Sequence, residues 1–527
     1  MTYLPSFGEL YVVSDIHLGG RRNNQQDFQI FNRGQRLGNL IDHIANRRLD
    51  EDVCLVLNGD IIDSLAEDEV PGYVALDGDT TIRMMDHIFT DPSFKPVWEA
   101  LAGFVNTPKR HLVFVVGNHD IELALPVVER AIGERLAGAQ GADAFARIQF
   151  ATHGGGFACR VAGARVFCTH GNEVDDWNCV DFGKLGELAN AINAGRAGDP
   201  FKWKPNAGTR LVVDVMNNIK QRYPFIDLLK PEAVAVAAVM LALDKDVFKH
   251  VDLKEAFPIL RDKIQGGLVT KNLLGANESD FSTVPAPDLA EETAIHLLGP
   301  SFQEAVRNQR RDARHPSEDE LLLDAERAIN NGQSTVVKAA SQSDQETLGA
   351  WDIFAGWIGL VPKVEGLRRA LKDWLKDDRT FKIDDPDDLY HKMQSRIGSQ
   401  VDFVVTGHTH KPRAMVLQRG AGYYYNCGTW IRTLRLTNEV VADQNQEAFE
   451  KIVWPALTAG TLAALDEPLI PGPGGVKVPL GLDRTNVVQI SAQGNSAVGN
   501  LLKVTDGPSP GSVQLYPEPD TTPFKVG

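Results

Sequence analysis

Five short segments of the chain each place a side chain that binds metal ions directly after a hydrophobic run. They are Asp15-Ile16-His17, Gly59-Asp60, Gly117-Asn118-His119-Asp120, Thr169-His170-Gly171 and Gly407-His408-Thr409-His410. Imidazole, carboxylate and amide groups together favour manganese, iron or zinc over magnesium or calcium alone. The five segments therefore predict a site for two adjacent divalent ions, with manganese as the first choice and iron or zinc as alternatives.

The predicted metal ligands combine three kinds of donor atom. Asp15 and His17 stand at alternate positions after a strand, so their side chains are expected to point the same way. The Asp60 carboxylate has enough oxygens to bridge two cations, and Asn118 offers a neutral carbonyl oxygen. The complete predicted set is Asp15, His17, Asp60, Asn118, His170, His408 and His410.

This ligand set indicates phosphoester chemistry. Two ions roughly 3.5–4 Å apart can hold a bridging hydroxide and clamp the attacking and leaving oxygens of an in-line displacement at phosphorus. His119 follows Asn118 directly and would face the substrate, where it could protonate the leaving oxygen. Asp120 is placed to orient that imidazole. We therefore predict hydrolysis of a phosphodiester or pyrophosphate bond, with His119 and Asp120 as the catalytic residues.

Three arginines are candidates for binding a substrate phosphate, and one further histidine lies in a motif like that of a predicted metal ligand. Arg21 and Arg22 follow the first motif, and Arg432 follows a Gly-Thr-Trp turn. A guanidinium group can hold a phosphate through two parallel hydrogen bonds. His153 repeats the Thr-His-Gly pattern of His170, but the run before His170 is the better buried strand. We therefore predict that His170 is the ligand and that His153 lies at the surface or beside the site.

The elements that must position these residues alternate between strand and helix over the first 170 residues. Short β-branched runs and stretches with apolar residues at helical spacing follow one another, which predicts an α/β fold with buried strands. In such a sheet the carboxyl ends of the strands gather their loops into one crevice. The strands are expected at 10–14, 53–58 and 111–116, the helices at 28–48 and 82–89, and a strand meander at 148–152, 157–161 and 165–169.

The long interval between two of the predicted ligands indicates how the chain is divided into domains. His170 and His408 are 238 residues apart, whereas the other motifs follow one another at about 40 to 60 residues. A helical insertion into one catalytic domain explains this interval, because the ligands on both sides must meet. We predict a core at 1–176 and 393–442, a mainly helical insertion at 177–392 that shapes substrate access, and a Pro- and Gly-rich β extension at 443–527.

The composition of the chain argues against two properties, binding of a long nucleic acid and the presence of a transmembrane segment. The formal net charge of −16, with no run of Lys and Arg, argues against binding of a long nucleic acid. No secretory leader is visible, and the longest apolar stretch, 233–243, is about half the length needed to span a bilayer. These features predict a cytoplasmic protein without a transmembrane segment. An aromatic-rich stretch at 351–361, followed by an amphipathic one at 364–375, predicts packing onto the core. Its alternative is an acyl-chain pocket or a peripheral membrane contact.

The motifs together resemble those of the calcineurin-like metallophosphoesterases. The resemblance rests on Asp15-x-His17, Gly59-Asp60-x-x-Asp63, Gly117-Asn118-His119-Asp120, His170 and Gly407-His408-x-His410, and it covers roughly residues 8–182 and 395–436. It implies a four-layer α/β/β/α sandwich with metals at the strand ends. One metal would be held by Asp15, His17, Asp60 and His410, and the other by Asp60, Asn118, His170 and His408. His119 would then be the catalytic histidine.

Two further segments refine the resemblance. Residues 14–19 and 425–430 look most like the branch that contains the UDP-2,3-diacylglucosamine pyrophosphatases, in which helical insertions can form a lid over lipid chains. This likeness implies a small or lipid-linked phosphate as substrate. A nuclease or cyclic-nucleotide phosphodiesterase on the same core is the alternative reaction. An interaction scaffold with a vestigial site is the alternative of another class.

Overall fold

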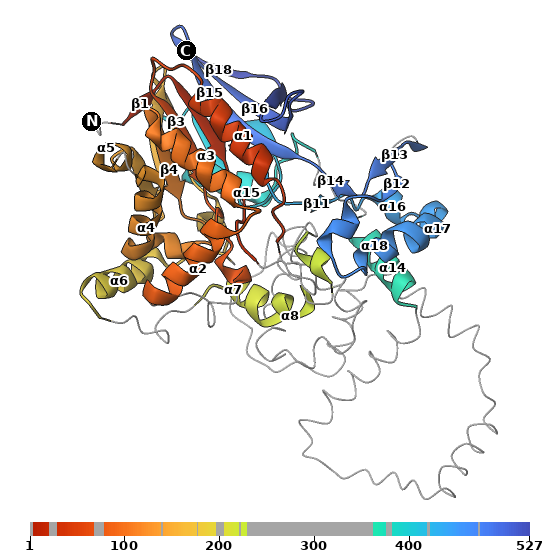
Figure 1. Cartoon of the computed structure of the whole chain (residues 1–527). Helices are drawn as coiled ribbons and strands as arrows, with labels where there is room; N and C mark the ends of the chain where they lie inside the picture. The colour runs from red at the N-terminus through yellow and green to blue at the C-terminus, as the bar shows by residue number, and fades with distance from the viewer. Residues whose placement is uncertain are drawn as a thin grey trace, which may run out of the picture.

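The computed structural model describes most of the predicted core and part of the predicted insertion. It covers residues 4–20, 29–67, 78–138, 141–176, 178–196, 205–220, 223–228, 362–375, 382–418, 422–472 and 475–527. Arg21, Arg22, the aromatic-rich stretch at 351–361 and the apolar stretch at 233–243 lie outside these residues. The described part is a mixed α/β structure built on two sheets (Figure 1).

The larger sheet has eight strands and contains the first three strands predicted from the sequence. Its parallel part consists of Glu9–Val13 (β2), Val53–Asn58 (β3), Arg110–Val115 (β4) and Ile148–Ala151 (β5). Its antiparallel part consists of Thr485–Gln493 (β15), Ser496–Asp506 (β16), Val513–Pro517 (β17) and Phe524–Val526 (β18). The strand order is β17-β16-β15-β2-β3-β4-β5, and β18 also pairs with β16.

The C-terminal strands are therefore part of the central sheet. β15 lies antiparallel beside β2, with Val488 opposite Val12. The sequence predicted a small β extension at 443–527, and its composition gave no sign that β15 completes the sheet next to the first strand. The start of that range is helical, with Gln446–Ala448 (α17) and Trp454–Leu457 (α18). The short helix Asn438–Val441 (α16) comes directly before the range.

The smaller sheet has six strands and joins the two parts of the chain on either side of the long interval. Its strands, in spatial order, are Ser6–Phe7 (β1), Phe157–Val161 (β6), Ala164–Cys168 (β7), Phe403–Thr406 (β8), Tyr423–Asn426 (β10) and Arg413–Val416 (β9). β7 and β8 pair in parallel, with Val166 opposite Phe403. This pairing brings the chain before the predicted insertion next to the chain after it.

The predicted meander of three strands is wrong in one respect. β6 and β7 form an antiparallel hairpin in the smaller sheet, but β5 pairs in parallel with β4 in the larger sheet. The chain crosses between the sheets at 152–156, where Gly154 and Gly156 have φ values of 72° and 61°. Glycine adopts this backbone region without the steric cost that a side chain would add.

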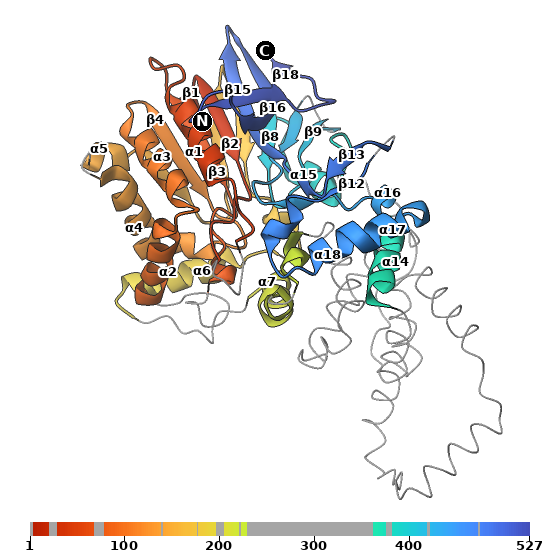
Figure 2. The ribbon, with the colours of Figure 1, turned by 45° about the vertical axis from the view of Figure 1, so that its right-hand side comes forward.

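Strand residues alternate between two cores, as a period of two requires. On β2, Leu10 and Val12 face the smaller sheet, whereas Tyr11 and Val13 face helices. The helices on that outer face are Gly34–Ala45 (α1), Gly78–Thr90 (α2), Lys95–Asn106 (α3) and Pro126–Ala137 (α4) (Figure 2). The outer face of the smaller sheet packs against Asp388–Arg396 (α15), where Tyr390 contacts Tyr424.

A buried arginine ties the outer helices to the C-terminal strands. Arg36 on α1 donates from Nε to Asp506 Oδ1 (3.0 Å) and from Nη2 to Asp506 Oδ2 (2.6 Å). Its Nη1 also donates to Asp483 Oδ1 (2.5 Å). Because Asp506 ends β16 and Asp483 precedes β15, these contacts fix the edge of the antiparallel part against α1.

The remaining described elements lie around the strand ends and beside the smaller sheet. The helices are Gly141–Phe145 (α5), Phe182–Asn193 (α6), Ala207–Arg210 (α7), Asn217–Lys220 (α8) and Lys363–Leu375 (α14). The strands are Thr433–Leu434 (β11), Leu469–Pro471 (β12), Lys477–Pro479 (β13) and Gly481–Leu482 (β14). Among the described residues, no helix combines the length and the apolar character needed to cross a membrane.

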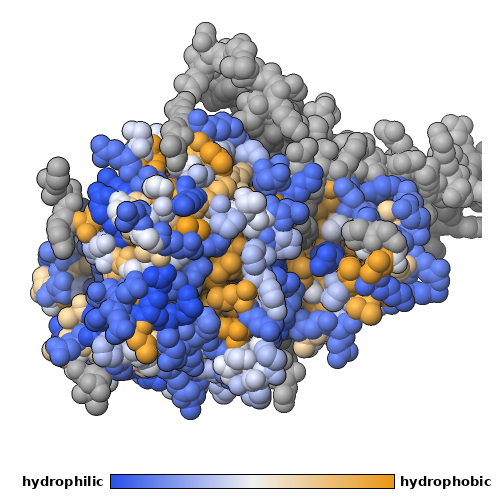
Figure 3. All heavy atoms as spheres, turned by 90° about the horizontal axis from the view of Figure 1, so that it is seen from above, coloured by the Kyte–Doolittle hydropathy of each residue, from blue (hydrophilic) through white to orange (hydrophobic). Residues whose placement is uncertain are grey.

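The surface on the upper side of Figure 1 mixes polar and apolar residues, with apolar patches interrupted by hydrophilic side chains (Figure 3). The large apolar side chains that the described residues expose come from several separate elements. They are Leu49, Phe145, Val416, Leu469, Val476 and Tyr516.

Candidate metal centre

The predicted ligands follow the ends of strands from both sheets. Asp15 and His17 follow β2, Asp60 follows β3, and Asn118 follows β4 in the larger sheet. His170 follows β7, while His408 and His410 follow β8, in the smaller sheet. Parallel strands deliver their carboxyl ends to one edge, so five loops that are distant in sequence meet there.

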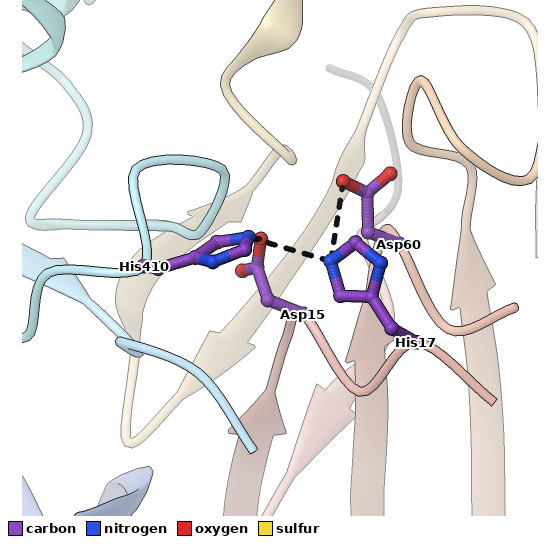
Figure 4. Close-up of side chains that lie close together, drawn as sticks. All are labelled: Asp15, His17, Asp60 and His410. Atoms are coloured by element: carbon purple, nitrogen blue, oxygen red, sulfur yellow. Dashed lines mark hydrogen bonds and ion pairs between the residues drawn. The ribbon is translucent and has the colours of Figure 1, made fainter. Parts of the chain in front are cut away.

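One group of side chains gathers around the loop after β2. Candidate ligand atoms of Asp15, His17, Asp60 and His410 all lie within 4.8 Å of one another (Figure 4). His410 Nε2 lies 3.1 Å from Asp15 Oδ1 and 3.3 Å from His17 Nε2. Two imidazole nitrogens that face each other and a carboxylate define one point, which is the arrangement expected of ligands that share a cation.

A second group shares one residue with the first. Candidate ligand atoms of Asp60, His170 and His408 lie within 4.8 Å of one another. Asp60 Oδ2 is 3.2 Å from His170 Nε2 and 3.9 Å from His17 Nε2. The Asp60 carboxylate therefore stands between the two groups, where the sequence placed a bridging ligand.

Asn118 also lies beside Asp60. The His119 N–H donates to Asp60 Oδ1 (2.9 Å), and a Cβ added to Gly117 would lie 2.1 Å from the same oxygen. Asn118 Oδ1 is buried and has no hydrogen-bond donor among the described residues. Leaving a buried acceptor unsatisfied costs about 1–3 kcal/mol. An oxygen-binding cation would satisfy this atom, so the Asn118 amide fits the predicted ligand set.

The backbone is left-handed at five of the seven candidate ligands. Asp15, His17, Asp60, His408 and His410 have φ values of 55°, 55°, 50°, 70° and 56°. This region costs a residue with a side chain about 1–2 kcal/mol, and such strain clusters at functional sites. Asp15 and His17 thus converge through left-handed turns beyond β2, and the strand alternation that the sequence suggested is not the reason.

Hydrogen bonds fix the orientation of several candidate ligands. His170 Nδ1 lies 2.9 Å from the Asn58 carbonyl oxygen, so Nδ1 donates its proton there and Nε2 is the ring nitrogen that faces Asp60. His408 Nε2 lies 2.9 Å from Asp175 Oδ2. The Ser14 hydroxyl donates to Asp15 Oδ2 (2.5 Å). Partners of this kind hold ligand rings and carboxylates in the geometry that a metal requires.

The carboxylate that contacts the predicted catalytic histidine is Asp63. Asp63 Oδ1 lies 3.1 Å from His119 Nδ1. Asp120 instead accepts hydrogen bonds from the backbone N–H groups of Gly117 (2.6 Å) and Ile61 (2.7 Å). The prediction that Asp120 orients His119 is therefore wrong, because its carboxylate closes the loop on which His119 stands. The second aspartate of the Gly-Asp-x-x-Asp motif was the signal for Asp63.

The electrostatics of the cluster favour charged groups. Burial alone would raise the pKa of Asp15, but His410 and His170 hold it at about 2, and His170 and His119 lower the pKa of Asp60 further. Burial alone would lower the pKa of His119, yet Asp60 and Asp63 raise it to about 9. Asp60 likewise raises the pKa of His170, to about 10. The site thus concentrates carboxylate charge that a cation can neutralise.

Some of the other predicted residues are placed away from the cluster or are already engaged. Arg432 donates from Nε and Nη2 to the Asp466 carboxylate (2.9 and 2.8 Å), so its guanidinium is already paired and the structure does not support a phosphate-binding role. His153 is exposed and belongs to none of the metal-binding groups of the described residues. Asp175 and Asn58 were not singled out from the sequence, since no short motif marks them.

Comparison with known proteins agrees with the geometry. Residues 9–234 match the family model of the calcineurin-like phosphoesterases. The matched segment contains Asp15, His17, Asp60, Asn118 and His170, and it supports assignment to that superfamily, whose members are phosphoester hydrolases with a dinuclear divalent metal centre. His408 and His410 lie beyond the matched segment but in the same cluster. No curated protein matches the chain.

Proposed function

We propose that this protein is a metal-dependent hydrolase of a phosphodiester or pyrophosphate bond in a small or lipid-linked phosphate. The observation that carries the proposal is the Asp60 carboxylate, which stands between two groups of His and Asp side chains. A carboxylate flanked by imidazoles on both sides can bridge two neighbouring divalent ions, and such pairs of ions clamp the attacking and leaving oxygens of a displacement at phosphorus.

Each ion has a proposed set of ligands. Asp15, His17, Asp60 and His410 would hold the first ion, and Asp60, Asn118, His170 and His408 would hold the second. The mixture of imidazole and oxygen donors favours manganese, with iron or zinc as alternatives. Divalent ions at these positions would polarise a phosphoryl oxygen and supply a nucleophile at neutral pH.

His119 is the proposed general acid. Its Nδ1 faces Asp63, which leaves Nε2 to donate a proton to the leaving oxygen, and 21% of its side chain is exposed to solvent. The contact with Asp63 favours the protonated imidazole. Asp60 also accepts from the His119 backbone N–H (2.9 Å), so the general acid and the central carboxylate are held at a fixed separation.

The narrower substrate proposal concerns the segment after β10. Thr429 Oγ1 and the Trp430 N–H both donate to the Asp15 carbonyl oxygen (2.8 and 3.0 Å), so this segment supports the first ligand loop. Its resemblance to the UDP-2,3-diacylglucosamine pyrophosphatase branch favours a lipid-linked pyrophosphate.

We also propose that α15 forms the fourth layer of an α/β/β/α sandwich and that 177–392 is an insertion that shapes substrate access.

The reaction class is tested with chelated protein reloaded with Mn²⁺. Turnover of bis-p-nitrophenyl phosphate and of the monoester is measured with and without the metal. We expect metal-dependent turnover, its loss in Asp60→Asn, and a decrease of about 10²–10⁴-fold in His119→Gln. His153→Ala, at an exposed histidine, is the matched control. If neither substrate is turned over in a metal-dependent way, the proposed function is wrong.

The bond preference is tested separately. Initial rates on a nucleotide-sugar pyrophosphate, on cyclic AMP and on single-stranded DNA are compared under the same conditions. We expect the pyrophosphate to be preferred, because the net charge of −16 disfavours a polynucleotide. A preference for cyclic AMP or DNA would replace the substrate proposal while leaving the metal centre in place.

A further inference from the structure

A third group of metal-binding side chains lies beside the two groups that we assign to the proposed ions. Candidate ligand atoms of His17, Asp63 and His119 all lie within 4.8 Å of one another. His17 also belongs to the group around the loop after β2, just as Asp60 belongs to both of the groups already described. The three groups therefore form a row in which each neighbouring pair shares one residue.

The Asp63 carboxylate faces an imidazole with each of its oxygens. Asp63 Oδ1 lies 3.1 Å from His119 Nδ1, and Asp63 Oδ2 lies 3.7 Å from His17 Nδ1. The His17 and His119 rings meet edge to face, with their centroids 4.8 Å apart. Two imidazole nitrogens and a carboxylate thus converge on one place, as the ligands of a single cation do.

The two ring nitrogens of His17 face different groups. Nε2 lies 3.3 Å from His410 Nε2 and 3.9 Å from Asp60 Oδ2, in the group that would hold the first ion (Figure 4). Nδ1 is buried in a side chain that is only 2% exposed, and it has no hydrogen-bond partner among the described residues. Buried polar atoms of native proteins are nearly always paired. A cation beside Asp63 would give Nδ1 its partner, and the ring would then bridge two ions.

Backbone contacts hold the three side chains in this arrangement. The Asp63 N–H donates to the Leu18 carbonyl oxygen (3.1 Å), which keeps the loops of His17 and Asp63 side by side. The Ser64 hydroxyl donates to the His119 carbonyl oxygen (2.8 Å), which ties the third loop to the second. His17 and Asp63 are buried, whereas 21% of the His119 side chain is exposed. The group is therefore fixed in place and open to ions from solvent through His119, as a metal site requires.

We propose that His17, Asp63 and His119 form a third cation site, which binds an inhibitory divalent ion once the two proposed ions are in place. The mixture of imidazole and carboxylate ligands favours Zn²⁺. Binding would release the Nδ1 proton of His17 to solvent and leave the ring as an imidazolate between two cations. This inference rests on the proposed function, because it describes how excess metal regulates the same site.

An ion at this site would inhibit hydrolysis because it removes His119 from its proposed role. A general acid must give up a proton, here from Nε2, to the leaving oxygen. When Nδ1 coordinates a cation, loss of the Nε2 proton leaves an imidazolate, so the ring is a much weaker acid than an imidazolium. The ion would also separate His119 from Asp63, which now contact each other directly.

The test counts the metal ions bound to the full chain and follows turnover separately. Wild type, Asp63→Asn and His119→Gln are dialysed to equilibrium against rising concentrations of free Zn²⁺ and, in parallel, of Mn²⁺, and the bound metal is measured by elemental analysis. His153→Ala is the matched control, because it removes an exposed histidine that belongs to none of the three groups. Hydrolysis of bis-p-nitrophenyl phosphate by the wild type is measured over the same concentrations.

We expect the wild type and His153→Ala to bind one additional, weaker ion after the first two. Asp63→Asn and His119→Gln should hold that ion at least about 100-fold more weakly, since even the loss of a residue that only orients a ligand weakens a metal site about 10- to 100-fold. Turnover should fall as the additional ion binds.

Identical binding curves for the wild type and both folded variants would overturn the inference, and so would an additional ion that leaves turnover unchanged. The absence of metal-dependent turnover at every metal concentration would instead count against the proposed function. In that case the difference between the binding curves of the wild type and the variants would still decide whether the third site exists.

Discussion

Replacing Asp63 with Asn tests which carboxylate controls the predicted general acid. In the metal-free protein the Asp60 and Asp63 carboxylates overcome the effect of burial and raise the pKa of His119 to about 9. An opposite charge at 3.1 Å, the distance between Asp63 Oδ1 and His119 Nδ1, shifts a pKa by about 1–3 units, or about 1.4–4 kcal/mol. Asp63→Asn should therefore lower the pKa of His119 by about that amount.

The sign of the accompanying stability change follows from the same shift. The folded-state pKa of His119 lies above the unfolded value of about 6.5, so its contribution to stability is fully present below pH 6.5. That contribution is lost as the pH rises through about 9. The stability difference between wild type and Asp63→Asn should therefore be largest near pH 6 and should shrink toward pH 9.

The assay is a titration of the histidine ring nitrogens by NMR in metal-free protein with ¹⁵N-labelled histidine. The His119 signals are assigned as those missing from His119→Gln. Asp120→Asn is the control, because the Asp120 carboxylate accepts from the Gly117 and Ile61 amides, whereas the carboxylate that contacts His119 Nδ1 is that of Asp63. If Asp120→Asn lowers the pKa of His119 as much as Asp63→Asn does, the reasoning from geometry is refuted.

Three further predictions concern other contacts. Trp430→Phe should lower the free energy of unfolding in urea by about 1–3 kcal/mol, because the Asn486 carbonyl loses its indole donor at 3.0 Å. Trp430→Ala should lower it by about 3–5 kcal/mol or more, because it also leaves a cavity in the core. Equal losses for the two variants would contradict this prediction. Asp175→Asn should weaken Mn²⁺ binding about 10- to 100-fold in a metal titration, since the variant loses the carboxylate that orients His408, and unchanged binding would refute that role. Arg36→Ala should cost about 1 kcal/mol at neutral pH, because its two carboxylate partners are partly exposed. The pKa values of Asp483 and Asp506 are lowered, chiefly by hydrogen bonds to Arg36 that overcome burial where it opposes them, so this cost should begin to shrink below about pH 4 and be lost once the pH falls below the lowered pKa values. A cost that does not shrink on acidification would show a packing effect instead.

The strands that carry the site were predictable because each is encoded locally. The expected strand at 53–58 is β3, and those at 10–14 and 111–116 differ from β2 and β4 by one residue at each end. A buried strand needs a short β-branched run, and that run is visible in any window of the sequence. The pairing partners were less predictable, because β5 and β6 are neighbours in sequence but belong to different sheets.

The C-terminal strands show most clearly that strand pairing cannot be predicted from local sequence. The sequence predicted a β extension at 443–527, but it did not predict that β15 lies beside β2, which comes from the opposite end of the chain. An antiparallel strand can complete any open edge of suitable register, so composition alone does not select the edge. The contact of Trp430 with Asn486 and the contacts of Arg36 with the C-terminal strands exist only after that edge is chosen.

The sequence by itself determined the chemistry that the site can perform, because ligand type is a property of each side chain and the motifs are short and local. Tertiary structure decided which side chains meet. It placed Asp63 rather than Asp120 against His119, since the loop geometry directs the Asp120 carboxylate to backbone amides. It turned the backbone of Asp15 and His17 into the left-handed region. Each of these outcomes depends on contacts between segments far apart in the chain, which no local pattern of residues specifies.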